Sequence, residues 1–172
     1  MGGRQTTGLA KAIGNRAKVV TQDIRTAVRA YADSDFDYLV ARWHETNRVS
    51  YRYVDEHQRH TLEEARAFFR NRLLSSCAVW VAEESGNLVG MLALEAPWIR
   101  QLAVFPEHQR RGVGTALLRK ARESSPDELR LFTFQRNDKA RAFYEKHGFT
   151  IVAFGISPAP ELEPDVEYRW AA

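Results

Sequence analysis

The sequence contains almost no cysteine and no long apolar run. Cys77 is the single cysteine among 172 residues, so no disulfide can form within the chain. No apolar stretch approaches the roughly 20 residues that a membrane-spanning helix needs. These absences lead us to expect a protein of the reducing cytoplasm with no membrane partner. Cys77 comes before a strand-like apolar run, so we expect a partly buried thiol and not a nucleophile.

Acidic residues are missing from the first 22 positions. The net charge is only +3, and the basic residues before Asp23 account for much of it. The remainder is close to neutral, which argues against a general nucleic-acid binder. Residues 1–22 also lack the apolar core of a secretory signal, so we expect a basic extension without fixed structure, with a transit peptide as the alternative. Residues 23–172 are long enough to form a single domain with a sizeable core.

Hydrophobic periodicity and turn residues predict the element order β-α-α-β-β-β-α-β-α-β-β. A chain of this order builds an α/β (α+β) fold, with a mixed, twisted sheet of six to seven strands flanked by four helices. Thr61 and Glu64 form a capping box, Asp33 and Asn137 are expected caps, and Gly148 ends the last helix. The expected strands are 24–30, 78–84, 88–94, 98–105, 129–134, 149–155 and 165–170; the expected helices are 33–47, 61–74, 115–122 and 138–147.

The most informative segment is a strand, a basic glycine-rich loop and the start of a helix, over residues 99–122. Pro106 ends the strand, and Gly112 and Gly114 flank one apolar residue before the helix. Glycines allow positive φ and close approach, and the first N–H groups of a helix have no intrahelical partner. With the helix dipole and the charges of Arg110 and Arg111, these features predict an anion cradle. The alternative is a tight loop that only lets helix and strand pack.

Two familiar phosphate-binding patterns do not fit this loop. No Gly-Lys-Ser/Thr follows the glycines, which excludes the Mg-nucleotide P-loop, and the third glycine of the dinucleotide-binding fingerprint is missing. The pattern Gln109-x-x-Gly112-x-Gly114 instead resembles the acyl-CoA diphosphate loop of the GNAT N-acetyltransferase superfamily. Residues 137–149, which include Asn137-Asp-Lys-Ala and Phe143-Tyr144-Glu, resemble the second signature of that superfamily. The looser resemblance extends from about residue 24 to residue 170.

The resemblance implies a GNAT fold in which strands 98–105 and 129–134 part at one end and hold the ligand in a V-shaped opening. It also implies an N-acetyltransferase that moves an acetyl group from acetyl-CoA to a primary amine by direct attack, without a metal or a covalent enzyme intermediate. The amides of residues 110–115 would bind the diphosphate, and the edge of residues 102–104 would pair with the pantetheine arm. An N–H of that edge would polarise the thioester carbonyl. The implied cofactor-binding residues are Leu102, Ala103, Val104, Gln109, Arg110, Arg111, Gly112, Val113, Gly114, Thr115, Asn137 and Tyr144.

Tyr144 is the catalytic residue that the resemblance implies. A phenol with a pKa of about 10 can protonate a departing thiolate whose conjugate acid has a pKa near 8.5, especially where water is excluded. The alternative is that Tyr144 only packs against the sheet, as Phe143 is expected to do. Asn137 would bind the pantetheine or the preceding loop, and a plain helix N-cap is compatible with both roles.

The general base and the acceptor amine stay open. Members of the superfamily often carry an acidic residue where this sequence has Arg100, so Glu95 and Glu45 are weaker candidates for the base. The first two helices and their connection would line the acceptor site, together with Trp98 from the sheet. An aromatic, basic-leaning wall would suit a small amine with a carboxylate or an aromatic group. The expected wall residues from the helices are Trp43, Arg48, Tyr51 and Tyr53.

Further alternatives are left by the sequence. His57 and His60 lack a carboxylate or cysteine partner set, so a solvated loop is expected there and no metal site. The acidic residues 161–165 are expected to form a surface loop, which in this superfamily can shape the acceptor site. The acceptor amine can belong to a small molecule or a protein, and a homodimer is left open. The alternative function is a non-catalytic module that binds acyl-CoA as a sensor.

Overall fold

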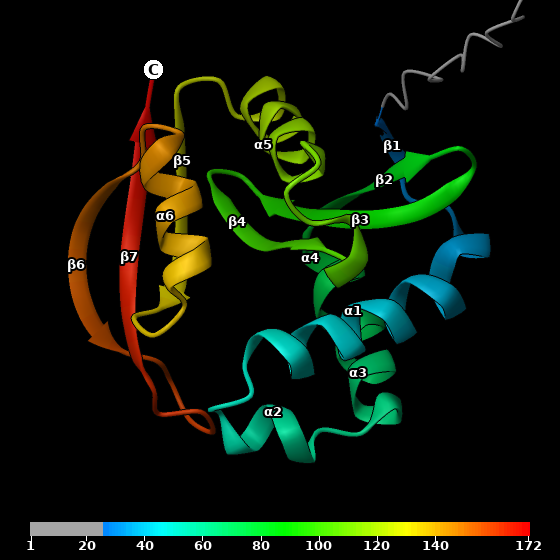
Figure 1. Cartoon of the computed structure of the whole chain (residues 1–172), viewed down its shortest axis with the longest axis horizontal. Helices are drawn as coiled ribbons and strands as arrows, with labels where there is room; N and C mark the ends of the chain where they lie inside the picture. Colours follow the sequence, from blue (N-terminus) through cyan, green and yellow to red (C-terminus); the bar gives the residue numbers. More distant parts are fainter. Residues whose placement is uncertain (1–25) are drawn as a thin grey trace, which may run out of the picture.

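A computed structural model describes residues 26–172, which form one seven-stranded sheet (Figure 1). The strand order is β1-β2-β3-β4-β5-β7-β6, and all neighbours are antiparallel except β4 and β5. This arrangement confirms the expected mixed sheet. The prediction for residues 1–22, and the start of the first expected strand, lie outside the described residues. The strands are β1 (Ala27–Ala30), β2 (Ala78–Glu84), β3 (Asn87–Glu95), β4 (Trp98–Val104), β5 (Glu128–Phe134), β6 (Thr150–Ile156) and β7 (Pro164–Ala171).

The helices largely follow the periodicity of the sequence, with one addition. The segment expected as a loop between the first two helices contains the short helix α2, which has acidic residues in its first turn and Arg59 in its last. This placement of charge favours a helix through its dipole. None of the helices in residues 26–172 is long and apolar enough to span a membrane. The helices are α1 (Phe36–Ser50), α2 (Asp55–Arg59), α3 (Leu62–Phe68), the π-helical turn η2 (Phe69–Leu73), α4 (Leu74–Ser76), α5 (Val113–Ser124) and α6 (Asp138–Lys146).

Local caps confirm one prediction and correct another. Thr61 Oγ1 accepts a hydrogen bond from the Glu64 amide at 3.2 Å, and the Glu64 carboxylate accepts from the Thr61 amide at 2.7 Å, which is the predicted capping box. The expected cap Asp33 is wrong. Residues 33–35 form a 3-10 turn before α1, so Asp35 directly precedes that helix. The Asp35 carboxylate accepts from the Ala32 amide at 2.9 Å, at the start of the turn, and bonds no amide of α1.

Helices cover both faces of the sheet and divide the core in two (Figure 1). The core under α1 and α3 includes Phe69, which is fully buried. The core under α5 and α6 includes Leu117 and Tyr168. The apolar spacing of the second expected helix predicts that Phe68 is buried, but the residue is 40% exposed, since the π-helical turn after it changes which residues face the core.

The two parallel strands meet at only one end, as the resemblance implied. The β4–β5 register consists of the single pair Trp98 and Arg130, and the Arg130 amide donates to Pro97 O at 2.8 Å. Beyond that pair the strands diverge toward their carboxyl ends (Figure 1). The β4 edge that faces β5 is therefore left without a ladder partner over most of its length.

Candidate functional site

The glycine-rich loop at the carboxyl end of β4 presents a row of unpartnered amides. The 3-10 turn η3 (Pro106–His108) leads into the loop, Gly112 has φ of 90°, and α5 begins at Val113. The Ala116 amide donates to Gly112 O at 3.0 Å, whereas the amides of residues 110–115 make no hydrogen bond within residues 26–172. A Cβ on Gly112 would meet no atom within 4 Å. The loop therefore leaves open space beside its N–H groups, which suits a diphosphate.

The polar side chains of the loop differ in what they contact. Gln109 Nε2 donates to Val104 O at 3.1 Å, which ties the loop to β4. An Arg111 guanidinium nitrogen lies 3.5 Å from a carboxylate oxygen of Glu84, a side chain that is only 6% exposed. Arg110 is exposed and forms no ion pair with another described residue. Gln109 and Arg111 thus brace the loop, and Arg110 is the guanidinium left to face an anion.

Packing against α6 explains why residue 114 is a glycine. A Cβ on Gly114 would lie 3.2 Å from the Phe143 ring, so only a glycine fits without displacement. His147 Nδ1 lies 2.8 Å from Phe143 O, and its Nε2 lies 3.2 Å from Thr115 Oγ1. A histidine that donates from Nδ1 and accepts at Nε2 satisfies both contacts. The packing interpretation is therefore correct for Gly114, and the loop that carries Gly112 is fixed to the helix that carries Tyr144.

Tyr144 is buried, yet its hydroxyl has no partner among residues 26–172. The residue is 7% exposed, and its ring lies 5.2 Å from that of Phe143 and 5.3 Å from that of Phe149, measured between centroids. Burial raises the pKa of the Tyr144 phenol well above its usual value, and the nearby Tyr51 phenol adds to the rise. The phenol is thus protonated at neutral pH and can donate a hydrogen bond or a proton.

Asn137 and Tyr51 join the end of α1 to the start of α6. Asn137 Oδ1 accepts from the Ala140 amide at 3.2 Å, which confirms the predicted helix cap. Burial raises the pKa of Tyr51, and the Asn137 side chain against it moderates the rise. The Tyr51 ring also lies 5.1 Å from that of Phe134 at the carboxyl end of β5. The sequence does not reveal this junction, because nothing in local spacing links α1 to α6.

Aromatic side chains gather over the carboxyl end of β5. The Phe134 ring lies 6.4 Å from Tyr53 and 6.0 Å from His57, in addition to its contact with Tyr51. Trp98 lies elsewhere on the sheet, stacked on Phe132 with centroids 5.4 Å apart and planes 3° apart. Of the residues predicted for the aromatic wall, Tyr51 and Tyr53 from the connection between α1 and α2 lie in this cluster.

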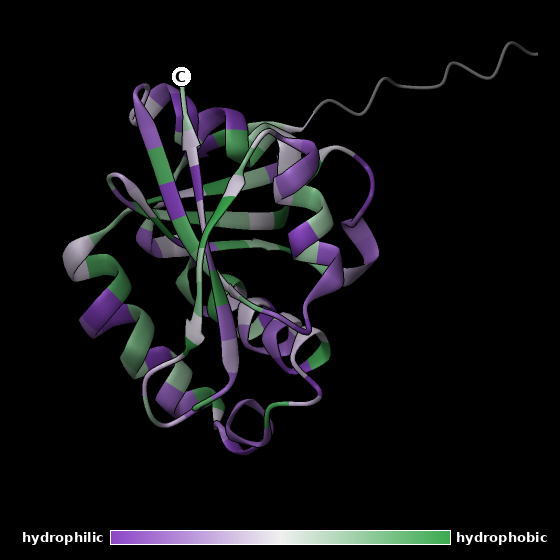
Figure 2. Cartoon of the chain, turned by 90° about the vertical axis from the view of Figure 1, so that its left-hand side faces the viewer, coloured by the Kyte–Doolittle hydropathy of each residue, from purple (hydrophilic) through white to green (hydrophobic). Residues whose placement is uncertain are grey.

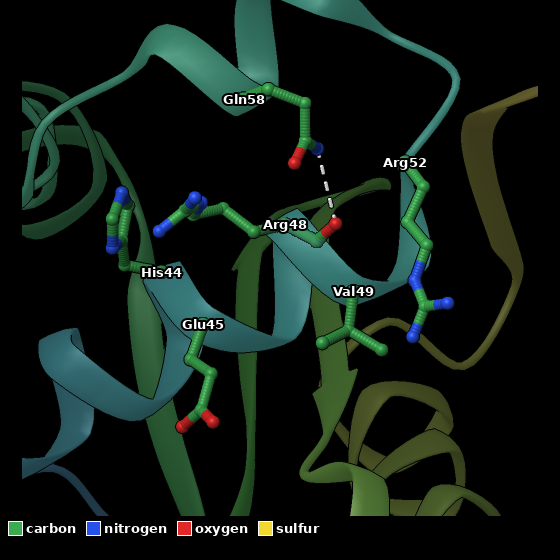
Figure 3. A pocket seen from close by; sticks show the side chains of 6 residues that line it. All are labelled: His44, Glu45, Arg48, Val49, Arg52 and Gln58. Carbon is green, nitrogen blue, oxygen red and sulfur yellow. Dashed lines mark hydrogen bonds between the residues drawn. The ribbon is translucent and has the colours of Figure 1, made fainter.

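Two residues predicted for that wall lie elsewhere. Trp43 is 5% exposed in the core under α1, and its Nε1 donates to Gln101 Oε1 at 3.2 Å, so its expected place in the wall is wrong. Its position on the inner face of α1 gives the physical reason. Arg48 lines a groove of about 330 Å³ between α1 and α2, where Gln58 Nε2 donates to Arg48 O at 3.1 Å (Figure 3). The other lining residues are His44, Glu45, Val49 and Arg52.

A second cavity of about 330 Å³ lies between α2 and the β6–β7 connection. It carries four carboxylates and one guanidinium, so this side of the candidate site is acidic and not basic-leaning as the sequence suggested. The lining residues are Tyr53, Asp55, Glu56, Arg59, Pro160, Glu161 and Glu163.

The two carboxylates considered for the general base are both in surface ion pairs. Glu95 lies 2.8 Å from Arg100, and Glu45 lies 2.5 Å from Arg42. Arg100 therefore neutralises the nearest acidic residue on the preceding strand. Within residues 26–172, no group of three or more His, Cys, Asp or Glu side chains is arranged to hold a metal ion.

Comparison with known sequences points to acetyltransferases. Residues 75–151 match the family described as acetyltransferase (GNAT) domain. The chain is 36% identical over 84 residues to the peptidyl-lysine N-acetyltransferase YiaC of Escherichia coli, covering 48% of this chain and 57% of YiaC. It is 35% identical over 82 residues to the probable N-acetyltransferase Rv2775 of Mycobacterium tuberculosis, covering 43% and 47%. The matches span about half the length of these curated relatives.

Solved structures share the fold over most of both chains. A GCN5-related N-acetyltransferase from Rhodopseudomonas palustris has a TM-score of 0.73 at 22% identity and covers 85% of this chain and 95% of its own. The PaiA N-acetyltransferase of Thermoplasma acidophilum, solved in complex with coenzyme A, has a TM-score of 0.64 at 18% identity, covering 87% and 100%. At these identities the likeness concerns the fold.

Proposed function

We propose that this chain, whose residues 75–151 match the acetyltransferase (GNAT) domain family, is an N-acetyltransferase that transfers an acetyl group from acetyl-CoA to a primary amine. The observation that carries the proposal is the divergence of β4 and β5 after the pair Trp98 and Arg130, with the row of unpartnered amides at its open end. The V-shaped opening and the anion cradle lie where a nucleotide thioester would need them. Solved relatives that contain coenzyme A or acetyl-CoA support this choice of acyl donor.

Binding of the donor rests on the backbone of two adjacent segments. The amides of residues 110–115 would hold the diphosphate, with Arg110 as the side-chain cation beside them. The free edge of Leu102–Val104 would pair with the amide groups of the pantetheine arm, in the manner of an added strand. Gln109 and Arg111 support the loop, and Thr115 connects it to His147 at the carboxyl end of α6. Asn137 caps the start of the same helix.

Proton transfer on the departing sulfur is the step that we assign to Tyr144. Its buried phenol is protonated, has no partner among the described residues, and lies on the helix that Gly114 and Thr115 tie to the cradle. As the neutral acceptor nitrogen forms its bond to the acetyl carbon, the carbon–sulfur bond breaks and the phenol donates its proton to the thiolate. The nitrogen then loses a proton to water, and the phenolate takes up a proton from water. A backbone N–H of β4 would polarise the thioester carbonyl.

The acceptor in this proposal is a primary amine of a small molecule or of a protein. The name of YiaC assigns it peptidyl-lysine, and a solved relative from Vibrio cholerae is a spermidine N-acetyltransferase. Both acceptors present an alkylammonium group to the enzyme, and the acidic cavity beside α2 is compatible with such a charge.

Release of free thiol from acetyl-CoA tests the proposal. The full chain is incubated with acetyl-CoA and a panel of alkylamines, amino acids and lysine peptides, and mass spectrometry identifies the N-acetyl product. We expect amine-dependent thiol release together with an acetylated amine. Tight binding of coenzyme A without turnover on any amine would contradict catalysis and favour an acyl-CoA sensor.

A further inference from the structure

Asp165, near the start of β7, is a buried carboxylate without a cation. Its side chain is 8% exposed, and among residues 26–172 no Lys, Arg or His lies within ion-pair distance of it. The hydrogen bond from Gln135 Nε2, at 2.9 Å, reaches the backbone oxygen of Asp165 and not its carboxylate. Burial raises the pKa of the Asp165 carboxyl, as expected where no positive charge compensates for lost hydration. Such a carboxylate is costly unless a cation from outside completes it.

The strand register places this carboxylate on the aromatic side of the candidate site. Asp165 pairs with Phe134 across the antiparallel β5–β7 ladder, and residues that pair in this way share a face of the sheet. The Phe134 ring contacts Tyr51 and His57 from the α1–α2 connection. Asp165 therefore lies beside the aromatic cluster that covers the carboxyl end of β5.

The neighbouring strand leaves room for the carboxylate. Gly155 pairs with Asp165 across the β6–β7 ladder, and a Cβ at Gly155 would lie 2.9 Å from Asp165 Oδ1. An L side chain at this position would push the carboxylate aside. The sheet thus accommodates a negative group at this point instead of covering it with an apolar side chain.

Other carboxylates on the same sheet have partners within the protein. Glu167 faces the same side two residues later and lies 3.5 Å from Arg130. Glu128 lies 3.1 Å from Arg130 and 2.9 Å from Arg169. The absence of a partner is therefore a property of Asp165 and not of this region of the sheet.

Charge around Asp165 favours a cation from outside. The acidic cavity is lined by Glu161 and Glu163, which come just before Asp165 in the chain, and by Asp55 and Glu56 from α2. Arg59 is the cationic residue of that lining, and it already lies 3.7 Å from Asp55. The field of this surface attracts positive charge toward the aromatic cluster.

We propose that Asp165 binds the ammonium group of the acceptor amine and thereby selects acceptors that are charged in solution. The inference rests on the proposed acetyltransferase function and adds the residue that recognises the acceptor. An ammonium at Asp165 gains a charge-assisted hydrogen bond, and it gives one proton to water before the freed nitrogen lone pair attacks the thioester. Asp165 lies on β7, whereas Glu95 and Glu45, the candidates for the general base, lie on β3 and α1.

Steady-state kinetics on Asp165→Asn test this inference. The acceptors are the best alkylamine of the thiol-release panel and a hydrazide of the same carbon skeleton, which is uncharged at neutral pH. We expect the KM for the alkylamine to rise about tenfold or more, because a hydrogen bond to a charged group is lost. The KM for acetyl-CoA and the KM for the hydrazide should stay as in the unchanged protein. Glu167→Gln is the matched control, and it should leave the KM for the alkylamine unchanged.

Gly155→Ala serves as the second variant should Asp165→Asn fail to fold. It keeps the carboxylate but displaces it, so a smaller rise in the same KM is expected. An unchanged KM for the alkylamine, or an equal rise for the hydrazide, overturns the role of Asp165. That result would leave the acetyltransferase proposal intact, because the unchanged protein still turns over. Absence of turnover with every amine would overturn both proposals.

Discussion

At the scale of single residues, burial changes the pKa of the tyrosine side chains in the candidate site. Tyr144 keeps its proton because water cannot stabilise its phenolate, and Tyr51 beside it adds repulsion against a negative charge. Its ring is held by Phe143 and Phe149, so the direction of the hydroxyl is set by packing. One side chain therefore contributes to the core and to the candidate chemistry.

Replacement of Tyr144 by phenylalanine separates these two contributions. The ring contacts remain, so we expect stability and coenzyme A affinity close to those of the unchanged protein. Loss of the proton donor should lower kcat by about 100-fold or more. Single-turnover thiol release and calorimetric titration of coenzyme A measure the two quantities. Tyr38→Phe, on an exposed position of α1, is the control; equal rates for both variants would remove the acid role.

At the scale of elements, the start of α5 brings the loop, β4 and α6 together. Gly112 provides a left-handed turn with open space above it, and Gly114 allows α6 to approach.

The edge strand β6 differs from this compact region, since all seven of its residues are exposed and several are large and apolar. Figure 2 views the molecule from this side, with β6 crossing the front largely in green and white.

Gly112→Ala tests the cradle as an element, and Gly86→Ala in the β2–β3 turn is its matched control. Both glycines have positive φ, and a Cβ at either would meet no atom within 4 Å. Each alanine should destabilise the fold by about 1 kcal/mol, because L residues are strained in this conformation. The Gly112 variant alone should weaken coenzyme A binding, by about tenfold or more, since the strain and the added methyl group disturb the diphosphate amides. Equal affinity in the two variants would mean that the loop does not bind the diphosphate.

At the scale of the whole molecule, the ion pairs of Arg29 join β1 to the turn before α1 and to the neighbouring strand β2. Arg29 of β1 donates to both carboxylate oxygens of Asp35, at 2.7 and 2.9 Å, and also pairs with Glu83 of β2. These bonds hold the pKa of Asp35 below its usual value of about 3.8. A carboxylate with a lowered pKa in the folded state stabilises the fold above its unfolded-state pKa, and this contribution is lost as the pH falls through the folded-state pKa.

Asp35→Asn should therefore destabilise the protein at neutral pH but not in strong acid. We expect a loss of about 1 kcal/mol at pH 7, because Arg29 is partly exposed and screened by solvent. The difference from the unchanged protein should persist down to about pH 4 and shrink below it, as urea unfolding at a series of pH values would show. Asp37→Asn removes an exposed ion pair with Arg66 and should change little. A constant difference between Asp35→Asn and the unchanged protein at all pH values would contradict the assignment.

Local chemistry determined a large part of this fold before any tertiary contact was known. Alternation and turn residues located the strands, the capping box of Thr61 and Glu64 located a helix, and the glycine-rich loop with residues 137–149 indicated the family. These features depend on hydrogen bonds and periodicities within a few residues, so the sequence carries them directly. Trp43, Phe68 and α2 were misjudged because their environments depend on neighbours far along the chain.

Tertiary structure alone decided which groups share the candidate site and which charges lack partners. The divergence of β4 and β5, the approach of Tyr51 to Tyr144, and the bracing of Arg111 by Glu84 all join segments distant in sequence. The same holds for Asp165, which reads as part of an acidic surface loop until β5 and β6 bury it without a cation. The sequence determines the chemical type of each side chain. Its exposure to water and its hydrogen-bond and ion-pair partners depend on which strands and helices pack against it, and only the folded sheet decides them.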